Sequence, residues 1–316
     1  MNRRTTVWAA LTAAMVLALS ACGGGTTGGD GSGVSGEVVS DGSSTVQPLT
    51  AAAGELFAGE HPGANVSVGT SGTGGGFEKF CTGETDISNA SRPIKDEEKA
   101  ACEKAGIEFT ELRVATDALT VVVSKDNDTV ECLTVDELKK MWEPAAEGKV
   151  TTWKQVRGDL PADKLELYGP GTDSGTFDYF TDEINGEEGA SRSDYNASED
   201  DNVLVKGVAG SKNALGYFGY TYFEENAGQL KAVQIDSGEG CVAPSAETAA
   251  DGTYTPLARP LFIYVNNASY KDKPQVAAFV DFYVEKDADI AKAAKFIALN
   301  SEQRSELETA AAGLAG

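Results

Sequence analysis

Residues 169–177 read Gly-Pro-Gly-Thr-Asp-Ser-Gly-Thr-Phe, a run of glycine and hydroxyl residues that ends in an apolar residue. Two similar stretches come earlier: Asp-Gly-Ser-Ser-Thr-Val at 41–46 and Gly-Thr-Gly-Gly-Gly-Phe at 72–77. Each is predicted to lead from a strand into a helix. At a helix start the first backbone N–H groups lack partners and the end of the helix dipole is positive. A bound anion accepts hydrogen bonds from these N–H groups and is attracted by the dipole. Since hydroxyl groups add further donors, the three turns predict a site for a small oxyanion.

The hydrophobic pattern around these turns alternates between the strand and helix periods. Short apolar runs predict strands at 38–39, 65–68 and 165–168, just before the three turns. Helices are expected over 48–60, 96–105, 177–184, 275–284, 290–299 and 301–312, and a capping box at 134–137 begins another. This alternation predicts an α/β fold with helices packed on sheets.

Two apolar extended runs, 118–123 and 261–265, stand apart from this alternation. The chain is long enough for two lobes of about 100–150 residues each, and each run is interpreted as a strand that crosses between them. The expected first lobe is therefore 37–123 plus 257–316, and the expected second lobe is 124–256.

The N-terminus indicates export. Arg3 and Arg4 precede an apolar stretch over 7–21, which is too short to span a membrane but matches a secretory signal. The stretch ends Leu-Ser-Ala-Cys at 19–22 and resembles the bacterial lipobox. We therefore expect a signal peptide at 1–21, a lipid on Cys22, and a flexible tether over 22–36. The protein is expected on the extracytoplasmic face of the bacterial cell membrane; an ordinary signal peptide with a chance cysteine is the alternative.

Four cysteines remain once Cys22 is set aside, and in an exported protein an even number suggests two disulfides. Four cysteines allow three pairings. We favour Cys81 with Cys102 and Cys132 with Cys241, over zinc binding, because the spacings differ from those of zinc-ligand pairs.

The formal net charge is −23, which argues against binding to nucleic acid. Acidity at the surface does not exclude an anion site, because surface charges are screened over about 8–10 Å while donors in a cleft act at contact distance. No metal and no cofactor is expected.

The glycine-rich turns resemble one known family, the phosphate-binding subunit of bacterial ABC phosphate importers. The resemblance rests on residues 42–46, 71–77, 86–93 and 169–177, in this order along the chain. It implies a two-lobed periplasmic-binding-protein-like fold of type II, with two mixed sheets flanked by helices and a two-strand hinge. It also implies a receptor that closes around inorganic phosphate and delivers it to an ABC permease, without catalysis. The expected form is a monomer.

By that resemblance, phosphate is held by donors from both lobes. Ser91 and Arg92 fill the segment where the family contributes a further first-lobe contact. The other implied ligands come from the three turns: Ser44, Thr45, the backbone N–H of Val46, Thr73, Ser174, Gly175 and Thr176.

Two departures from the family matter. Its better-known members carry an aspartate where this chain has Ser91, and that aspartate accepts the proton of hydrogen phosphate. They also carry an arginine shortly before the Ser-Gly-Thr turn, where this chain has Pro170. Arg92 is therefore expected to be the main charge contact, unless it only pairs with a surface carboxylate. Asp173 or Asp41 could supply the missing acceptor, and either could instead cap a helix.

Other functions fit the sequence less well. A receptor for another tetrahedral oxyanion such as sulfate is the main alternative, and a secreted phosphate-ester hydrolase is the alternative from a different class. A serine triad lacks a base, because the one histidine, His61, precedes Pro-Gly in a helix-ending loop. The P-loop pattern is absent, and the aromatic residues between 142 and 223 are interpreted as core rather than as a sugar site.

Overall fold

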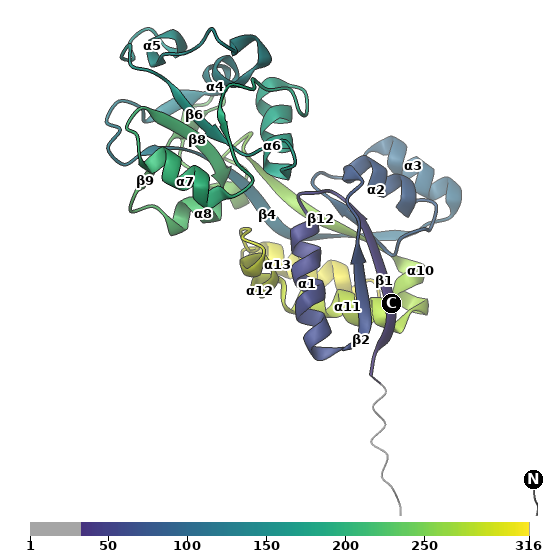
Figure 1. Cartoon of the computed structure of the whole chain (residues 1–316). Coiled ribbons are helices and arrows are strands. Elements are labelled where there is room, and N and C mark those ends of the chain that lie inside the picture. The colour runs from purple at the N-terminus through teal and green to yellow at the C-terminus, as the bar shows by residue number, and fades with distance from the viewer. Residues whose placement is uncertain (1–32, 316) are drawn as a thin grey trace, which may run out of the picture. The chain divides into compact units, whose positions relative to one another are not determined.

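The computed structural model describes residues 33–315, so the expected signal peptide, Cys22 and most of the tether lie outside the described residues (Figure 1). The strands are β1 Ser35–Gly42, β2 Gly63–Val68, β3 Ile87–Ala90, β4 Phe109–Ser124, β5 Cys132–Thr134, β6 Glu166–Gly169, β7 Asn196–Ala197, β8 Ala214–Gly219, β9 Leu230–Ala232, β10 Gln234–Asp236, β11 Cys241–Val242 and β12 Ala258–Asn266. The α-helices are α1 Gln47–Glu60, α2 Gly72–Phe80, α3 Asp96–Ala105, α4 Val135–Trp142, α5 Trp153–Val156, α6 Gly175–Phe180, α7 Asp201–Ala209, α8 Tyr220–Glu225, α9 Ala246–Ala250, α10 Asn267–Asp272, α11 Pro274–Glu285, α12 Asp287–Ala293 and α13 Ser301–Ala312. The described residues also contain a 3-10 turn, η1 Pro144–Ala146, and a π-helical turn, η2 Thr181–Asn185.

The strands form a mixed sheet in the order β2-β1-β3-β12-β4-β8-β6-β7, with β9 paired to β4. A separate three-stranded sheet has the order β11-β10-β5. Within the large sheet β4 pairs with β12 through residues 109–118 and with β8 through 119–123. The predicted α/β class is confirmed, and the two parts of the large sheet are joined through β4.

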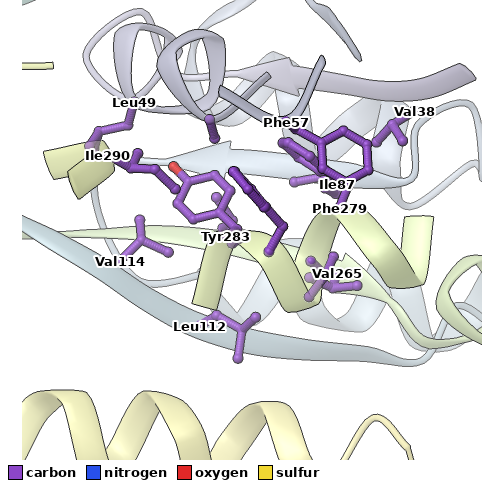
Figure 2. Close-up of a cluster of buried hydrophobic side chains, with 14 of the residues drawn as sticks. Val38, Leu49, Phe57, Ile87, Leu112, Val114, Val265, Phe279, Tyr283 and Ile290 are labelled. Atoms are coloured by element: carbon purple, nitrogen blue, oxygen red, sulfur yellow. The ribbon is translucent and has the colours of Figure 1, made fainter. Parts of the chain in front are cut away.

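Two groups of elements flank this shared strand. In the terminal half, α1 and α10–α13 pack with β1–β3 around the cluster drawn in Figure 2, which includes Leu49, Phe57 and Phe279. The helices α2 and α3 form a smaller cluster with Phe77, Phe80 and Cys102.

In the central half, α4–α6, β5, β6, β8 and β10 pack around Trp142, Tyr217 and their neighbours. The helices α7 and α8 and strand β9 pack in another cluster with Leu204, Phe218 and Leu230. In β4, residues 112, 114 and 115 belong to the first cluster and residues 119, 121 and 123 to the second. The crossing segment, 116–118 with 258–260, therefore lies between two separate cores.

Most predicted elements are present with boundaries within a few residues. The exception is the helix expected over 290–299, because α12 ends at Ala293. Lys295 takes a left-handed backbone with φ 64°, and the N–H of Phe296 donates to the carbonyl of Ala291. These bonds end the helix as a Schellman motif, and Ile297 then pairs with Thr116 of β4.

The aromatic residues considered for a sugar site serve mainly as core. Trp142, Trp153, Tyr217 and Phe218 are almost fully buried. No helix among residues 33–315 is both long and apolar enough to cross a membrane.

The favoured disulfide pairing is confirmed. Cys81 at the end of α2 is bonded to Cys102 in α3, and Cys132 in β5 is bonded to Cys241 in β11. The second bond joins two strands that both pair with β10 and closes a sequence separation of 109 residues.

Replacing both Cys132 and Cys241 by serine is expected to lower the free energy of unfolding by about 2–4 kcal/mol, because the cross-link limits the unfolded chain. The Cys81–Cys102 bond closes a separation of only 21 residues, so the Cys81→Ser, Cys102→Ser variant is expected to lose about 1.5 kcal/mol less. Guanidinium unfolding measures both. A larger loss from the shorter loop would contradict the chain-entropy explanation.

Candidate functional site

A cavity of about 580 Å³ lies where the three glycine-rich turns meet. Its wall includes residues from the starts of α1, α2 and α6, and from the segment after β3. Of the predicted site residues, Ser44, Thr45, Thr73, Ser91, Arg92 and Gly175 line it. Val46, Ser174 and Thr176 adjoin lining residues in the chain but do not contribute to the wall.

The first turn presents unpaired backbone donors. Gly42 has φ 140°, and a Cβ there would lie 2.2 Å from the carbonyl oxygen of Asn89, so only glycine fits. The carbonyl of Asn89 accepts from Ser43 N–H at 2.9 Å. Within the described residues, the N–H groups of Ser44, Thr45 and Val46 donate no hydrogen bond. Next to the positive end of α1, these groups can receive an anion.

The second turn is tied to the segment after β3. Thr73 Oγ1 lies 3.1 Å from Ser91 Oγ and accepts from Ser91 N–H at 3.3 Å. The two hydroxyl groups therefore face the cavity as a pair.

The third turn brings the central half against the terminal half. A Cβ at Gly175 would lie 2.8 Å from Thr45 Oγ1 and 3.1 Å from Thr45 N. The absence of a side chain thus lets the start of α6 approach the start of α1. Ser174 Oγ accepts from Thr176 N–H at 3.2 Å, so this hydroxyl caps α6 and keeps its own proton to donate.

Arg92 lines the cavity and also forms an ion pair. Its guanidinium donates to both carboxylate oxygens of Glu98, at 2.7 and 2.8 Å. This hydrogen bonding raises the pKa of Arg92, while burial opposes the rise. The ion pair given as the alternative for Arg92 is therefore present, while its role as the main charge contact stays a prediction.

Arg259 is a second cavity-lining arginine, and the sequence reasoning missed it. Its Nη2 donates to Thr45 Oγ1 at 2.9 Å, and its Nε lies 3.3 Å from Asp117 Oδ2. The guanidinium also lies 3.6 Å from the ring centroid of Tyr179. Arg259 thus connects the crossing segment with the first turn and with α6. Burial raises the pKa of Asp117, and the charge of Arg259 opposes this shift.

The two aspartates suggested as proton acceptors do not line the cavity. Asp41 accepts from the N–H and hydroxyl of Ser71 and pairs with Lys79. Burial alone would raise the pKa of Asp41, but Lys79 and Ser71 hold it below its usual value. Asp173 is exposed. The suggestion that either aspartate faces the ligand is therefore not supported.

Other carboxylates do line the cavity, all from α6 and the residues that follow it: Asp178, Asp182, Glu183 and Glu188. Asp178 is half-buried, and within residues 33–315 its carboxylate has no hydrogen bond or ion pair. Burial raises the pKa of Asp178, with a further increase from Glu188 and an opposing effect of Arg259. Its position four residues after Ser174 is a signal that sequence reasoning could have used, because residues at this spacing share a helix face.

The arrangement suits a small oxyanion better than a reaction. Three helix starts, several hydroxyl groups and two arginines converge on one cavity, while His61 lies at the end of α1 outside its wall. Among the described residues no cluster of histidine, cysteine and acidic side chains could hold a metal ion.

Known proteins are similar to this chain in sequence and in structure. "Protein SphX" of Synechocystis sp. is 47% identical over 92% of this chain and 84% of its own length. The "Phosphate-binding protein PstS" of Staphylococcus saprophyticus is 43% identical over 92% of this chain and 90% of its own. The crystal structure of "a possible phosphate binding protein" from Planctomyces limnophilus has a TM-score of 0.84 and 45% identity, covering 90% of this chain and all of that one.

The model of the "PBP superfamily domain" matches residues 27–287, which is most of the chain. The expected resemblance is therefore confirmed, and the chain belongs to the PBP superfamily, among relatives named as phosphate-binding proteins.

Proposed function

We propose that this protein is an extracytoplasmic receptor for inorganic phosphate that delivers its ligand to an ABC permease. The observation that carries the proposal is the cavity at which the starts of α1, α2 and α6 meet Arg92 and Arg259. A relative that is 43% identical is named a phosphate-binding protein, and the helix starts and arginines of this cavity are donors that suit phosphate.

The proposed ligand set keeps the residues expected from the sequence and adds Arg259. Ser44, Thr45 and Val46 donate from the first turn, and Thr73, Ser91 and Arg92 from the other terminal-half segments. Ser174, Gly175 and Thr176 donate from the central half. A multiply charged anion is costly to remove from water, so nearly every oxygen should receive donors.

The mechanism is closure of two lobes, 37–123 plus 257–316 and 124–256. Phosphate that bridges donors from both lobes binds the closed state better than the open state and shifts the population accordingly. The separate cores on the two sides of the crossing segment are consistent with this motion.

The proposed proton acceptor is Asp178. Hydrogen phosphate carries a proton at neutral pH and sulfate carries none, so an ionised carboxylate that faces the ligand favours phosphate. Asp178 is the half-buried carboxylate of the wall that lacks a partner within residues 33–315.

The proposed location is the outer face of the cell membrane, with Cys22 lipidated after removal of residues 1–21. The mature protein is proposed to act as a monomer, to use no cofactor and to catalyse no reaction.

Labelled phosphate bound to the purified protein should be displaced by arsenate but not by excess sulfate at neutral pH, measured by equilibrium dialysis. Equal displacement by sulfate would show a general oxyanion receptor instead. Turnover of a chromogenic phosphate ester by the same preparation would overturn the receptor proposal in favour of a hydrolase.

Arg92→Ala and Arg259→Ala are each expected to weaken phosphate binding at least tenfold, about 1.4 kcal/mol, because each removes a guanidinium from the wall of the cavity. Lys164→Ala is the control, because it also removes one positive charge from the protein but at an exposed position outside the cavity wall. Isothermal titration calorimetry measures all three affinities. If an arginine variant binds phosphate with the same affinity as the control, that arginine is not a phosphate ligand.

Asp178→Asn is expected to reduce the preference for phosphate over sulfate at least tenfold, about 1.4 kcal/mol, because the amide can donate to an unprotonated oxygen. In the wild type, sulfate should compete better as the pH falls, since protonated Asp178 becomes a donor. Because the pKa of Asp178 is raised, its protonation, and with it the stronger competition by sulfate, begins at a higher pH than for an ordinary aspartate. In the variant, this pH dependence should disappear.

Asp173→Asn is the matched control for Asp178→Asn, because it makes the same change at an exposed position outside the cavity wall. Competition dialysis across the acid to neutral range compares the two variants. If Asp173→Asn alters selectivity and Asp178→Asn does not, the acceptor has been misassigned.

A further inference from the structure

Ser43 is a buried serine whose hydroxyl the proposed ligand set does not use. It lies between Gly42 and Ser44 in the first glycine-rich turn and lines the cavity. Only 3% of its surface is exposed, whereas the next residue, Ser44, is exposed. Of the two adjacent serines, the one that sequence reasoning left out is therefore the one that packing holds in place.

Both backbone groups of Ser43 are already hydrogen-bonded. Its N–H donates to the carbonyl of Asn89 in β3 at 2.9 Å, and its carbonyl accepts from the N–H of Gln47, the first residue of α1, at 3.0 Å. These two bonds fix the residue between a strand and a helix start. The hydroxyl is therefore the one polar group of Ser43 that remains for another partner.

The hydroxyl of Ser43 does not cap α1. A serine at a helix start commonly accepts from an N–H two or three residues later, as Ser174 does from Thr176 N–H at 3.2 Å. Ser43 forms no such bond, and α1 begins without a side-chain cap. Within residues 33–315 the hydroxyl of Ser43 makes no hydrogen bond at all. One hydroxyl and three backbone N–H groups are therefore left open at the same turn.

Ser43 Oγ also differs from the sealed hydroxyl groups nearby. Ser40 Oγ in β1 and Ser88 Oγ in β3 lack partners too, but both are enclosed by protein atoms. Ser43 Oγ is not enclosed in this way, and the cavity is the space that its residue lines. Since a buried hydroxyl without a partner is costly, the partner of Ser43 Oγ has to come from the cavity.

The chemistry of the turn favours an anion as that partner. The open N–H groups beside Ser43 can only donate, and they lie at the positive start of α1. The hydroxyl of Thr45 already accepts from Arg259 Nη2 at 2.9 Å. The hydroxyl of Ser43 is free to donate to a charged oxygen and to accept from a protonated one, so it suits an oxyanion in either protonation state.

We propose that Ser43 Oγ is a further ligand of the oxyanion and donates to the oxygen that the first turn holds. This inference rests on the proposed function, which makes the anion phosphate. Because the side chain is buried and the backbone on both sides of it is bonded, the hydroxyl gives up little freedom when the ligand binds. A hydrogen bond to a charged group is stronger than one between neutral groups, so its loss is measurable.

Ser43→Ala removes this hydroxyl alone and is expected to weaken phosphate binding about tenfold in isothermal titration calorimetry. Ser40→Ala is the matched control, because Ser40 is also a buried serine whose hydroxyl lacks a partner, but it lies outside the cavity wall. Its phosphate affinity should equal that of the wild type. Wild-type affinity in Ser43→Ala, or an equal loss in both variants, would overturn the proposal.

Guanidinium unfolding separates a ligand from a residue that only supports the fold. Neither alanine variant gives up a side-chain hydrogen bond within residues 33–315, so both should keep the wild-type midpoint without phosphate. Saturating phosphate should raise the midpoint of Ser43→Ala less than that of the wild type or of Ser40→Ala. A lower ligand-free midpoint in Ser43→Ala, with an undiminished rise on adding phosphate, would assign the hydroxyl to the fold and contradict the inference.

Sulfate is a second probe that keeps the inference apart from the proposed function. If the wild type binds sulfate in place of phosphate, the proposed function fails, and sulfate binding about tenfold weaker in Ser43→Ala would still support Ser43 as an oxyanion ligand. Unchanged sulfate binding in this variant would count against it. If the wild type binds neither anion, the function and the inference are both wrong.

Discussion

The pairing of β4 with β12 is the constraint on which the rest of the structure depends. β4 contributes to the hydrophobic core on each side of the crossing segment, whereas β12 residues 261, 263 and 265 belong to the terminal core. Side-chain alternation at the crossing segment then puts Arg259 and Asp117 on one face and Ala258 and Ala118 on the other. A charged face towards the cavity and a small apolar face away from it follow from this single pairing.

The wall of the cavity proposed to bind phosphate carries charges of both signs, since Arg92, Lys95 and Arg259 lie in it together with Asp178, Asp182, Glu183 and Glu188. Arg92 is paired with Glu98, and Arg259 is close to Asp117. Uncharged donors at the starts of α1 and α2 can add to the attraction of an anion, because backbone dipoles are fixed and need no counter-ion. A net charge of −23 does not by itself exclude an anion, because donors act at contact distance while carboxylates on the outer surface are screened.

Local sequence signals predicted the parts of the site that depend on local geometry. Six of the predicted site residues line one cavity, and the structure shows close backbone approaches at Gly42 and Gly175 of the same turns. Asp178 was within reach of the same reasoning, since it shares a helix face with Ser174. Arg259 was not, because it lies 214 residues from Thr45 and only strand pairing brings the two together. The helix expected over 290–299 was too long because an unusual left-handed lysine ends α12.

By itself the sequence determined the α/β class, the three glycine-rich turns and the family resemblance, because each is expressed in local spacing or in residue type. It favoured one disulfide pairing of the three possible but did not determine it. Tertiary structure alone decided which charges line the cavity, which carboxylate lacks a partner within residues 33–315, and which residues, Lys295 and Glu225, link the two halves behind the crossing segment. The reason is physical: the charge state and reach of a side chain depend on the neighbours that packing supplies, and for Arg259 and Lys295 those neighbours come from distant parts of the chain.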